Sequence, residues 1–216
     1  MNFLKKCSSL NRNGNKNLGK LSIGITSAYK GAGATHLGLM LTACMSEGLG
    51  LKTAYLHCQN SKDIAYLYNY FHSLNERGRG EAFTVANATF YPYVSSEMIA
   101  HILARGYDSV VLDFGKDYSE YKEEFLRCDK KITVGSLLPW KRYYLEEFIR
   151  KSENVTGSAE WIYAVTHTDS KTVAKEAKQL QKKLFVIPYL EDPFYLSSEA
   201  MNITKSIINY ERADKG

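Results

Sequence analysis

A short glycine-rich segment contains the residues best suited to chemistry. Residues 28–36 read AYKGAGATH and follow the apolar run LSIGITS at 21–27. Glycines such as Gly31 and Gly33 let the backbone turn its N–H groups toward one point, where they can bind phosphate oxygens. A helix beginning near Thr35 would add partial positive charge. We therefore expect a nucleotide-binding loop formed by Lys30, Gly31, Ala32, Gly33, Ala34, Thr35 and His36.

Two loop chemistries compete for this segment. A dinucleotide fingerprint, G-x-G-x-x-G, would place its third glycine at His36, and residues 57–59 (HCQ) offer no acid to hold a ribose. A P-loop instead needs Lys and then Ser/Thr after its glycines, together with an Asp that ends another strand. Thr35 and Asp113, in VVLDFG, fit those two places and would form the Mg²⁺ site, whereas Ala34 replaces the lysine. The residues favour the P-loop.

Each of these residues also has an explanation without a ligand. The glycines could form a tight turn between strand and helix, and Thr35 could cap that helix. Asp113 could cap the loop that follows its strand. His36 and His57 have no third ligand at a recognisable spacing, so packed or loop histidines explain them better than a metal site.

The elements that must position the loop alternate regularly. Apolar, β-branched runs predict strands at 21–27, 52–58, 109–115, 131–138, 160–166 and 184–189, with one or two short strands in FTVANATFYPY at 83–93. Helical periodicity and caps predict helices at 37–50, 63–74, 95–106, 119–128, 140–152, 170–183 and 197–213. Apolar strands separated by such helices indicate a three-layer α/β fold, a mostly parallel sheet with helices on both faces.

Composition predicts one ordinary globular domain at 21–216. Of the 216 residues, 44% are hydrophobic and 24% charged, with no long apolar run and no secretory leader, so we expect a cytoplasmic protein. Four separated cysteines suggest reduced thiols without metal. Residues 1–20 are rich in Asn and Lys, without any acid. They predict a disordered basic tail, or a weak tether to DNA or an anionic membrane.

The loop, the strand ending at Asp113 and the late segment IPYLEDPF together resemble the ParA/MinD-type ATPases, of the SIMIBI class of P-loop proteins, and in particular their divergent TadZ-like members. The resemblance covers about residues 20–210 in element order. It implies a P-loop NTPase-like domain, ATP with Mg²⁺ as cofactors, protein partners and a homodimer. Aligned on Thr35, the family's signature lysine falls on Tyr29, with Lys30 one place away.

The sequence departs from the family at the positions that support hydrolysis. The family's second strand normally ends in D-x-D, where this chain has His57 and Gln59, and its adenine-contacting Asn falls near Thr166 and His167, with Asp169 following. Phosphoryl transfer depends on charge neutralisation and positioning, so loss of the lysine and of these acids predicts no efficient ATPase activity.

The sequence thus predicts a degenerate, TadZ-like protein that binds ATP-Mg weakly or without efficient hydrolysis and acts as a localisation or assembly adaptor. Two alternatives remain: an apo pseudo-ATPase scaffold that binds no nucleotide, and a slow ATPase that uses Lys30. Tyr66, Tyr70, Tyr143 and Tyr144 cannot all face inward from their helices, and exposed tyrosines are common at protein interfaces.

Overall fold

The computed structural model describes residues 21–71, 82–116 and 118–210. The predicted basic tail at 1–20 lies outside these residues. Among the described residues, no helix combines the length and the apolar character needed to cross a bilayer.

Eight strands of the described chain form one sheet in the order β3-β4-β2-β5-β1-β6-β7-β8. Neighbouring strands run parallel, except for the antiparallel pair β3 and β4. This arrangement confirms the mostly parallel sheet. The strands are β1 (Leu21–Ser27), β2 (Thr53–His57), β3 (Phe83–Val85), β4 (Ala88–Tyr91), β5 (Ser109–Asp113), β6 (Lys130–Ser136), β7 (Ile162–Thr166) and β8 (Leu184–Val186).

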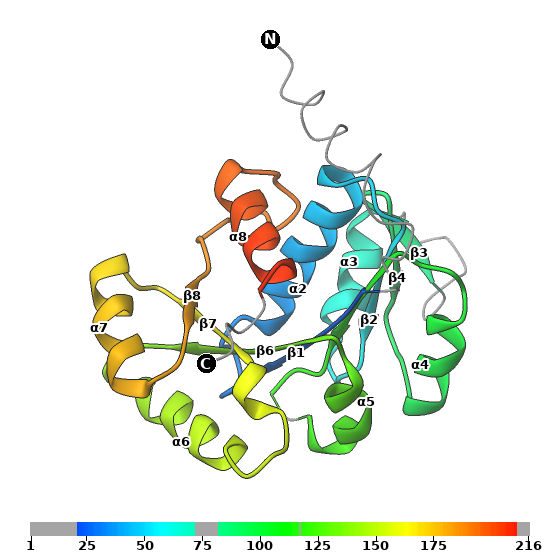
Figure 1. Cartoon of the computed structure of the whole chain (residues 1–216). Helices are drawn as coiled ribbons and strands as arrows, with labels where there is room; N and C mark the ends of the chain where they lie inside the picture. The colour runs from blue at the N-terminus through cyan, green and yellow to red at the C-terminus, as the bar shows by residue number, and fades with distance from the viewer. Residues whose placement is uncertain (1–20, 72–81, 117, 211–216) are drawn as a thin grey trace.

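Helices cover both faces of the sheet, which confirms the three-layer α/β fold. One face packs against α2, α3 and α8, and the other against α4, α5, α6 and α7 (Figure 1). The helices of the described residues are α2 (Ala34–Ala43), α3 (Asp63–Phe71), α4 (Ser96–Leu103), α5 (Lys122–Arg127), α6 (Arg142–Ser152), α7 (Ser170–Leu180) and α8 (Ser198–Ile208).

The central strands are apolar on both sides because each side meets a helix layer. Ile23 and Ile25 of β1 belong to one core with Met40 of α2. Leu112 of β5 belongs to the other core, with Phe125 of α5. Burial on both faces explains why these strands read as continuous apolar runs instead of alternating with polar residues.

Several boundaries differ from the predicted ones. The first helix begins at Ala34, next to the predicted start near Thr35 and three residues before the helical run at 37–50, and its last turn is a π-helix at Cys44–Gly48. The segment 83–93 forms an antiparallel hairpin whose turn residues, Ala86 and Asn87, have φ of 49° and 55°. A two-residue turn with positive φ at both positions matches the right-handed twist of the flanking strands.

The sheet brings three strand ends to one place. In the strand register, Asp113 of β5 lies opposite Ile25 of β1 and His57 of β2. Strand β1 lies between β5 and β6: the chain runs from β1 to β2 on one side of β1, and later passes from β5 to β6 on the other side. In open α/β sheets, ligands bind beyond the carboxyl ends of strands at such a point. The glycine-rich loop begins there.

Candidate functional site

The loop after β1 has the backbone geometry of a ligand cradle. Gly31 and Gly33 have φ of 83° and 107°, values that side-chain-bearing residues rarely adopt. Gly33 is the residue that precedes α2, and its carbonyl accepts from Leu37 N at 2.9 Å. The turn therefore needs glycine at both positions, whether or not a ligand binds.

The start of α2 leaves a set of backbone donors free. Among the described residues, no backbone carbonyl or side chain accepts a hydrogen bond from the amides of residues 33–36. The first amides of a helix have no partner within the helix, and they carry the positive end of its dipole. These four N–H groups can bind an anion without the help of any side chain.

The position of the missing lysine is part of the hydrophobic core. Ala34 is 5% exposed and packs in the same cluster as Ile25. Lys30 is exposed, and the described residues give it no ion pair. The loop thus offers its backbone and one exposed cation, Lys30, but no ammonium group at position 34.

Thr35 and Asp113, which the sequence paired, do meet. Thr35 Oγ1 donates to Asp113 Oδ2 at 2.7 Å. Thr35 therefore does not cap α2, because Gly33 holds the capping position and the Thr35 hydroxyl points to the neighbouring strand end. Asp113 does cap the loop that follows β5, since its Oδ1 accepts from Gly115 N at 3.0 Å, while its Oδ2 faces the glycine-rich loop.

Asp113 is the centre of a buried network that the sequence did not reveal. Its Oδ2 also accepts from Tyr55 Oη and from Gln59 Nε2, each at 2.7 Å. Gln59 Nε2 donates a second bond, to Thr35 Oγ1, at 3.0 Å. The spacing of Tyr55, His57 and Gln59, two residues apart, places them on one side of the strand and is visible in the sequence. That this side faces Asp113 follows from the pairing of β2 with β5, which the sequence does not show.

The network keeps the Asp113 carboxylate ionised. Burial of this fully enclosed carboxyl raises its pKa, but the protons directed at it from His57, Thr35 and Tyr55 outweigh that cost and leave the pKa below its usual value of 3.8. His57 Nδ1 lies 3.6 Å from Oδ2, too far for a hydrogen bond, so its effect is electrostatic. Burial beside this charge raises the pKa of Tyr55 well above 10.

The ring nitrogen of His57 that faces away from Asp113 is linked to the start of α3 through Ser61. His57 Nε2 lies 2.9 Å from Ser61 Oγ, and Ser61 Oγ donates to Asp63 Oδ2 at 2.9 Å. Asp63 is the first residue of α3. His57 is therefore a packed histidine tied to the start of a helix, as the explanation without a ligand predicted.

The Mg²⁺ site that Thr35 and Asp113 were expected to form does not fit the network as it stands. Magnesium needs oxygen ligands with free lone pairs at about 2.1 Å. Asp113 Oδ2 already accepts three short hydrogen bonds, and the amide nitrogen of Gln59 contacts both expected ligand atoms. Among the described residues, no group of three or more His, Cys, Asp or Glu could hold a metal ion.

The remaining predicted residues lie around the loop. Burial lowers the pKa of His36, in the first turn of α2, although Asp192 opposes this shift. The methyl group of Thr166, at the end of β7, is close to the Cα of Gly33, since a Cβ placed there would lie 3.8 Å away from it. Asp169 instead caps α7, accepting from Lys171 N at 2.9 Å and Thr172 N at 3.0 Å.

An aromatic and cationic group lies beside the loop. The ring of Tyr29, at the predicted place of the signature lysine, is 5.6 Å from that of Tyr144 on α6. Lys141 Nζ stands 4.7 Å from the Tyr29 ring centroid and 5.5 Å from that of Tyr144. Exposed tyrosines were predicted on α3 and α6, and Tyr66, Tyr70, Tyr143 and Tyr144 are indeed 60%, 82%, 62% and 42% exposed.

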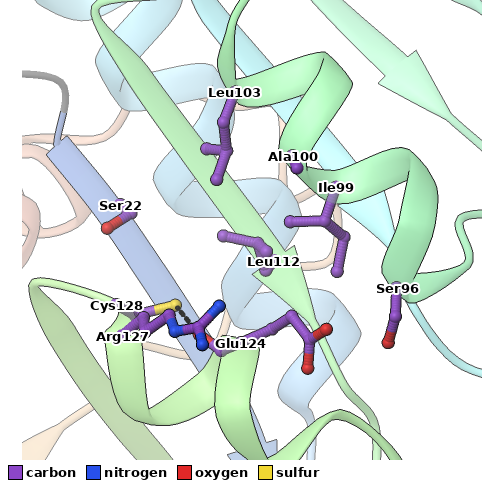
Figure 2. A pocket seen from close by; sticks show the side chains of 9 residues that line it. All are labelled: Ser22, Ser96, Ile99, Ala100, Leu103, Leu112, Glu124, Arg127 and Cys128. Atoms are coloured by element: carbon purple, nitrogen blue, oxygen red, sulfur yellow. Dashed lines mark hydrogen bonds between the residues drawn. The ribbon is translucent and has the colours of Figure 1, made fainter.

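A separate cavity lies between α4 and α5, away from the loop. Its volume is about 140 Å³, and Figure 2 shows Ile99, Leu103 and Leu112 converging on it, with Glu124 and Arg127 at the side of α5. Cavities that bind small molecules are usually roughly 300–1,000 Å³. This one is small and contains no residue of the glycine-rich loop, so it is not part of the candidate site.

Comparison with known proteins identifies the fold and not the activity. No family model matches the chain, and no curated protein matches it. The MinC:MinD cell division complex of Aquifex aeolicus superposes with a TM-score of 0.68, at 13% identity, over 91% of this chain and 99% of that chain. A plasmid partition protein of Borrelia burgdorferi bound to AMPPNP gives 0.62, at 16% identity, over 88% and 96%.

A third solved structure is MinD of Pyrococcus horikoshii complexed with Mg-ADP. It gives a TM-score of 0.56 at 13% identity, over 88% of this chain and 95% of that chain. The chain therefore has the fold of the ParA/MinD-type P-loop ATPases, as the resemblance in its loop and strands implied. At these identities the likeness concerns the fold alone.

Proposed function

We propose that this chain is a ParA/MinD-like protein that binds an adenine nucleotide at residues 30–36, weakly or without efficient hydrolysis, and acts as a localisation or assembly adaptor. The TadZ-like assignment is part of the proposal. The observation that carries it is the set of four free amides at residues 33–36, at the carboxyl edge of the sheet. A helix N-terminus on a glycine turn supplies both donors and positive potential to a phosphate.

Weak binding follows from the charges near the loop. Without a lysine at position 34, the donors are neutral amides and the exposed Lys30, which solvent screens. Slow or absent ATP hydrolysis follows from the residues at the ends of β2 and β5. Asp113 is engaged by four donors, and His57 and Gln59 provide no acid to orient an attacking water.

The adaptor part of the proposal rests on the surface. Four tyrosines of α3 and α6 are exposed. Tyr144 lies next to the loop through its contact with Tyr29, and Tyr143 lies beside Tyr144. A MinD relative has been solved in complex with MinC, so proteins of this fold do bind protein partners. We propose that nucleotide favours one conformation or a homodimer in the cytoplasm, and that the output is contact with another protein.

Calorimetric titration with ATP and with ADP, combined with a phosphate-release assay, tests the nucleotide part. We expect binding in the micromolar to millimolar range and no phosphate release above background. Absence of heat with both nucleotides would contradict the proposal and favour the apo scaffold. Steady phosphate release that disappears in Lys30→Ala would favour the slow ATPase.

A pair of glycine substitutions locates the site. Gly31 and Gly157 have φ of 83° and 80°, and a Cβ at either position would meet nothing within 4 Å. Alanine should therefore cost similar stability at both, about 1 kcal/mol. We expect Gly31→Ala to weaken nucleotide binding by about tenfold, because alanine disfavours the positive φ that the loop backbone needs. Gly157→Ala should leave nucleotide binding unchanged. Equal effects on binding would show that the loop is not the site.

A further inference from the structure

The amide group of Gln59 contacts both side chains that would hold a metal ion, Thr35 and Asp113. Its Nε2 donates one hydrogen to Asp113 Oδ2 at 2.7 Å and the other to Thr35 Oγ1 at 3.0 Å. An amide nitrogen has no lone pair to offer a cation, whereas it has two hydrogens to offer oxygens. Both hydrogens are used on the two atoms that a magnesium ion would need.

The orientation of this amide is fixed by its partners. An amide oxygen in place of Nε2 would face a carboxylate oxygen, two acceptors without a proton between them. On its other side, the amide lies over Gly115, where a Cβ would collide with Gln59 Oε1 and would come within 2.7 Å of Cδ. Gly115 has φ of 63°, so the loop after β5 is shaped to admit the glutamine side chain.

The carboxylate needs no cation to balance it. Asp113 accepts hydrogen bonds from the hydroxyls of Thr35 and Tyr55, from the Gln59 amide and from the backbone N–H of Gly115. A buried carboxylate with this many donors is stabilised in its charged form. To take either oxygen as a ligand, a magnesium ion would have to displace Gln59 and give up part of its hydration shell.

We infer that the Gln59 amide replaces the divalent cation, so that the glycine-rich loop binds its phosphate-bearing ligand without magnesium. This inference rests on the proposed nucleotide function and makes it more specific: the ligand is the metal-free nucleotide. Recognition comes from the amides of residues 33–36. The Thr35–Gln59–Asp113 arrangement is a hydrogen-bonded network in which Asp113 keeps its negative charge without a cation.

Calorimetry in two buffers tests the ligand part. ADP is titrated into the full chain in EDTA and in excess Mg²⁺, and we expect affinities that agree within about twofold. An affinity about tenfold higher in Mg²⁺ would overturn the inference while leaving the proposed function intact. Absence of binding in both buffers would refute the proposed function, and with it the metal-free binding.

A second experiment measures the affinity of the chain for a divalent cation in the absence of nucleotide. Mn²⁺ alone is titrated into the chain, and free Mn²⁺ is followed by electron paramagnetic resonance. Gln59→Glu replaces the donor with a carboxylate beside Asp113, so we expect it to bind Mn²⁺ about tenfold more tightly than the natural chain. Gln179→Glu makes the same charge change on α7, where Gln179 accepts from Arg142, and should leave Mn²⁺ binding unchanged.

One outcome would overturn this part: Mn²⁺ binding by the natural chain that is as tight as in Gln59→Glu. If the glutamate variant does not fold, Gln59→Ala takes its place, because it removes the amide without adding charge. That variant should also bind Mn²⁺ more tightly than the natural chain, and equal binding would count against the inference.

Discussion

At the scale of single residues, the site is organised by one buried carboxylate. Asp113 Oδ2 gathers three side chains, two from the region of β2 and one from α2. Each of these bonds joins elements that are distant in the chain. The network therefore acts as a tether between the sheet and the start of α2, in addition to whatever it contributes to ligand binding.

Tyr55→Phe measures the strength of this tether. The change removes only a hydroxyl that donates to a charged acceptor, so we expect it to lower the free energy of unfolding by about 1.5–3 kcal/mol. The matched control is Tyr163→Phe, another buried tyrosine, whose hydroxyl lies 3.2 Å from the neutral Ser152 Oγ. That control should lose about 0.5–1.5 kcal/mol in urea unfolding. Equal losses would indicate that Asp113 is uncharged.

At the scale of elements, the N-termini of α2 and α7 differ in how their backbone amides are satisfied. The start of α2 has no side-chain cap and leaves its amides free, whereas Asp169 caps α7 through Oδ1 and accepts from the Thr172 hydroxyl through Oδ2. Asp169 lies two residues after His167, in the region that the resemblance assigned to adenine contact. Its bonds to Lys171 and Thr172 give it a structural role instead.

Asp169→Ala should therefore affect stability and not binding. We expect the midpoint of thermal unfolding to fall by a few degrees, because two amides of α7 lose their acceptor. Nucleotide affinity should stay the same within experimental error. Asp169→Asn keeps the Oδ1 acceptor and should recover most of the loss. A clear drop in affinity for the alanine variant would place Asp169 in the binding site.

The elements themselves were largely predictable, and the network was not. The runs 21–27 and 52–58 predicted β1 and β2 closely, because strands buried on both faces are continuous in apolar residues. Thr35 and Asp113 were paired correctly through the spacing of the loop. Gln59 was noted only as a missing acid, because its role depends on the register of β2 with β5, a pairing across 54 residues that local pattern does not encode.

At the scale of the whole molecule, the loop, the rings of Tyr29 and Tyr144, and the end of β7 share one edge of the sheet. Exposed aromatic side chains around a ligand loop are a suitable place for a second subunit to respond to the ligand. The proposal of a nucleotide-dependent homodimer thus has a definite location on this chain.

Light scattering during size-exclusion chromatography tests that location. The chain of 24.5 kDa should double its mass when saturated with nucleotide. Tyr143→Ser should weaken this association by about tenfold, because Tyr143 is 62% exposed and lies beside Tyr144, which contacts Tyr29 of the loop. Tyr70→Ser is the control, since Tyr70 is 82% exposed on α3. A mass that nucleotide leaves unchanged would contradict the homodimer.

The two outermost strands of the described sheet restrict how copies of this chain can associate. β3 and β8 contain three residues each, so each border offers only a few unpaired amides and carbonyls to a foreign strand. Short border strands hinder the growth of a sheet from one molecule into the next. Assembly by strand addition is therefore disfavoured, and any specific dimer must form through side chains of loops and helices.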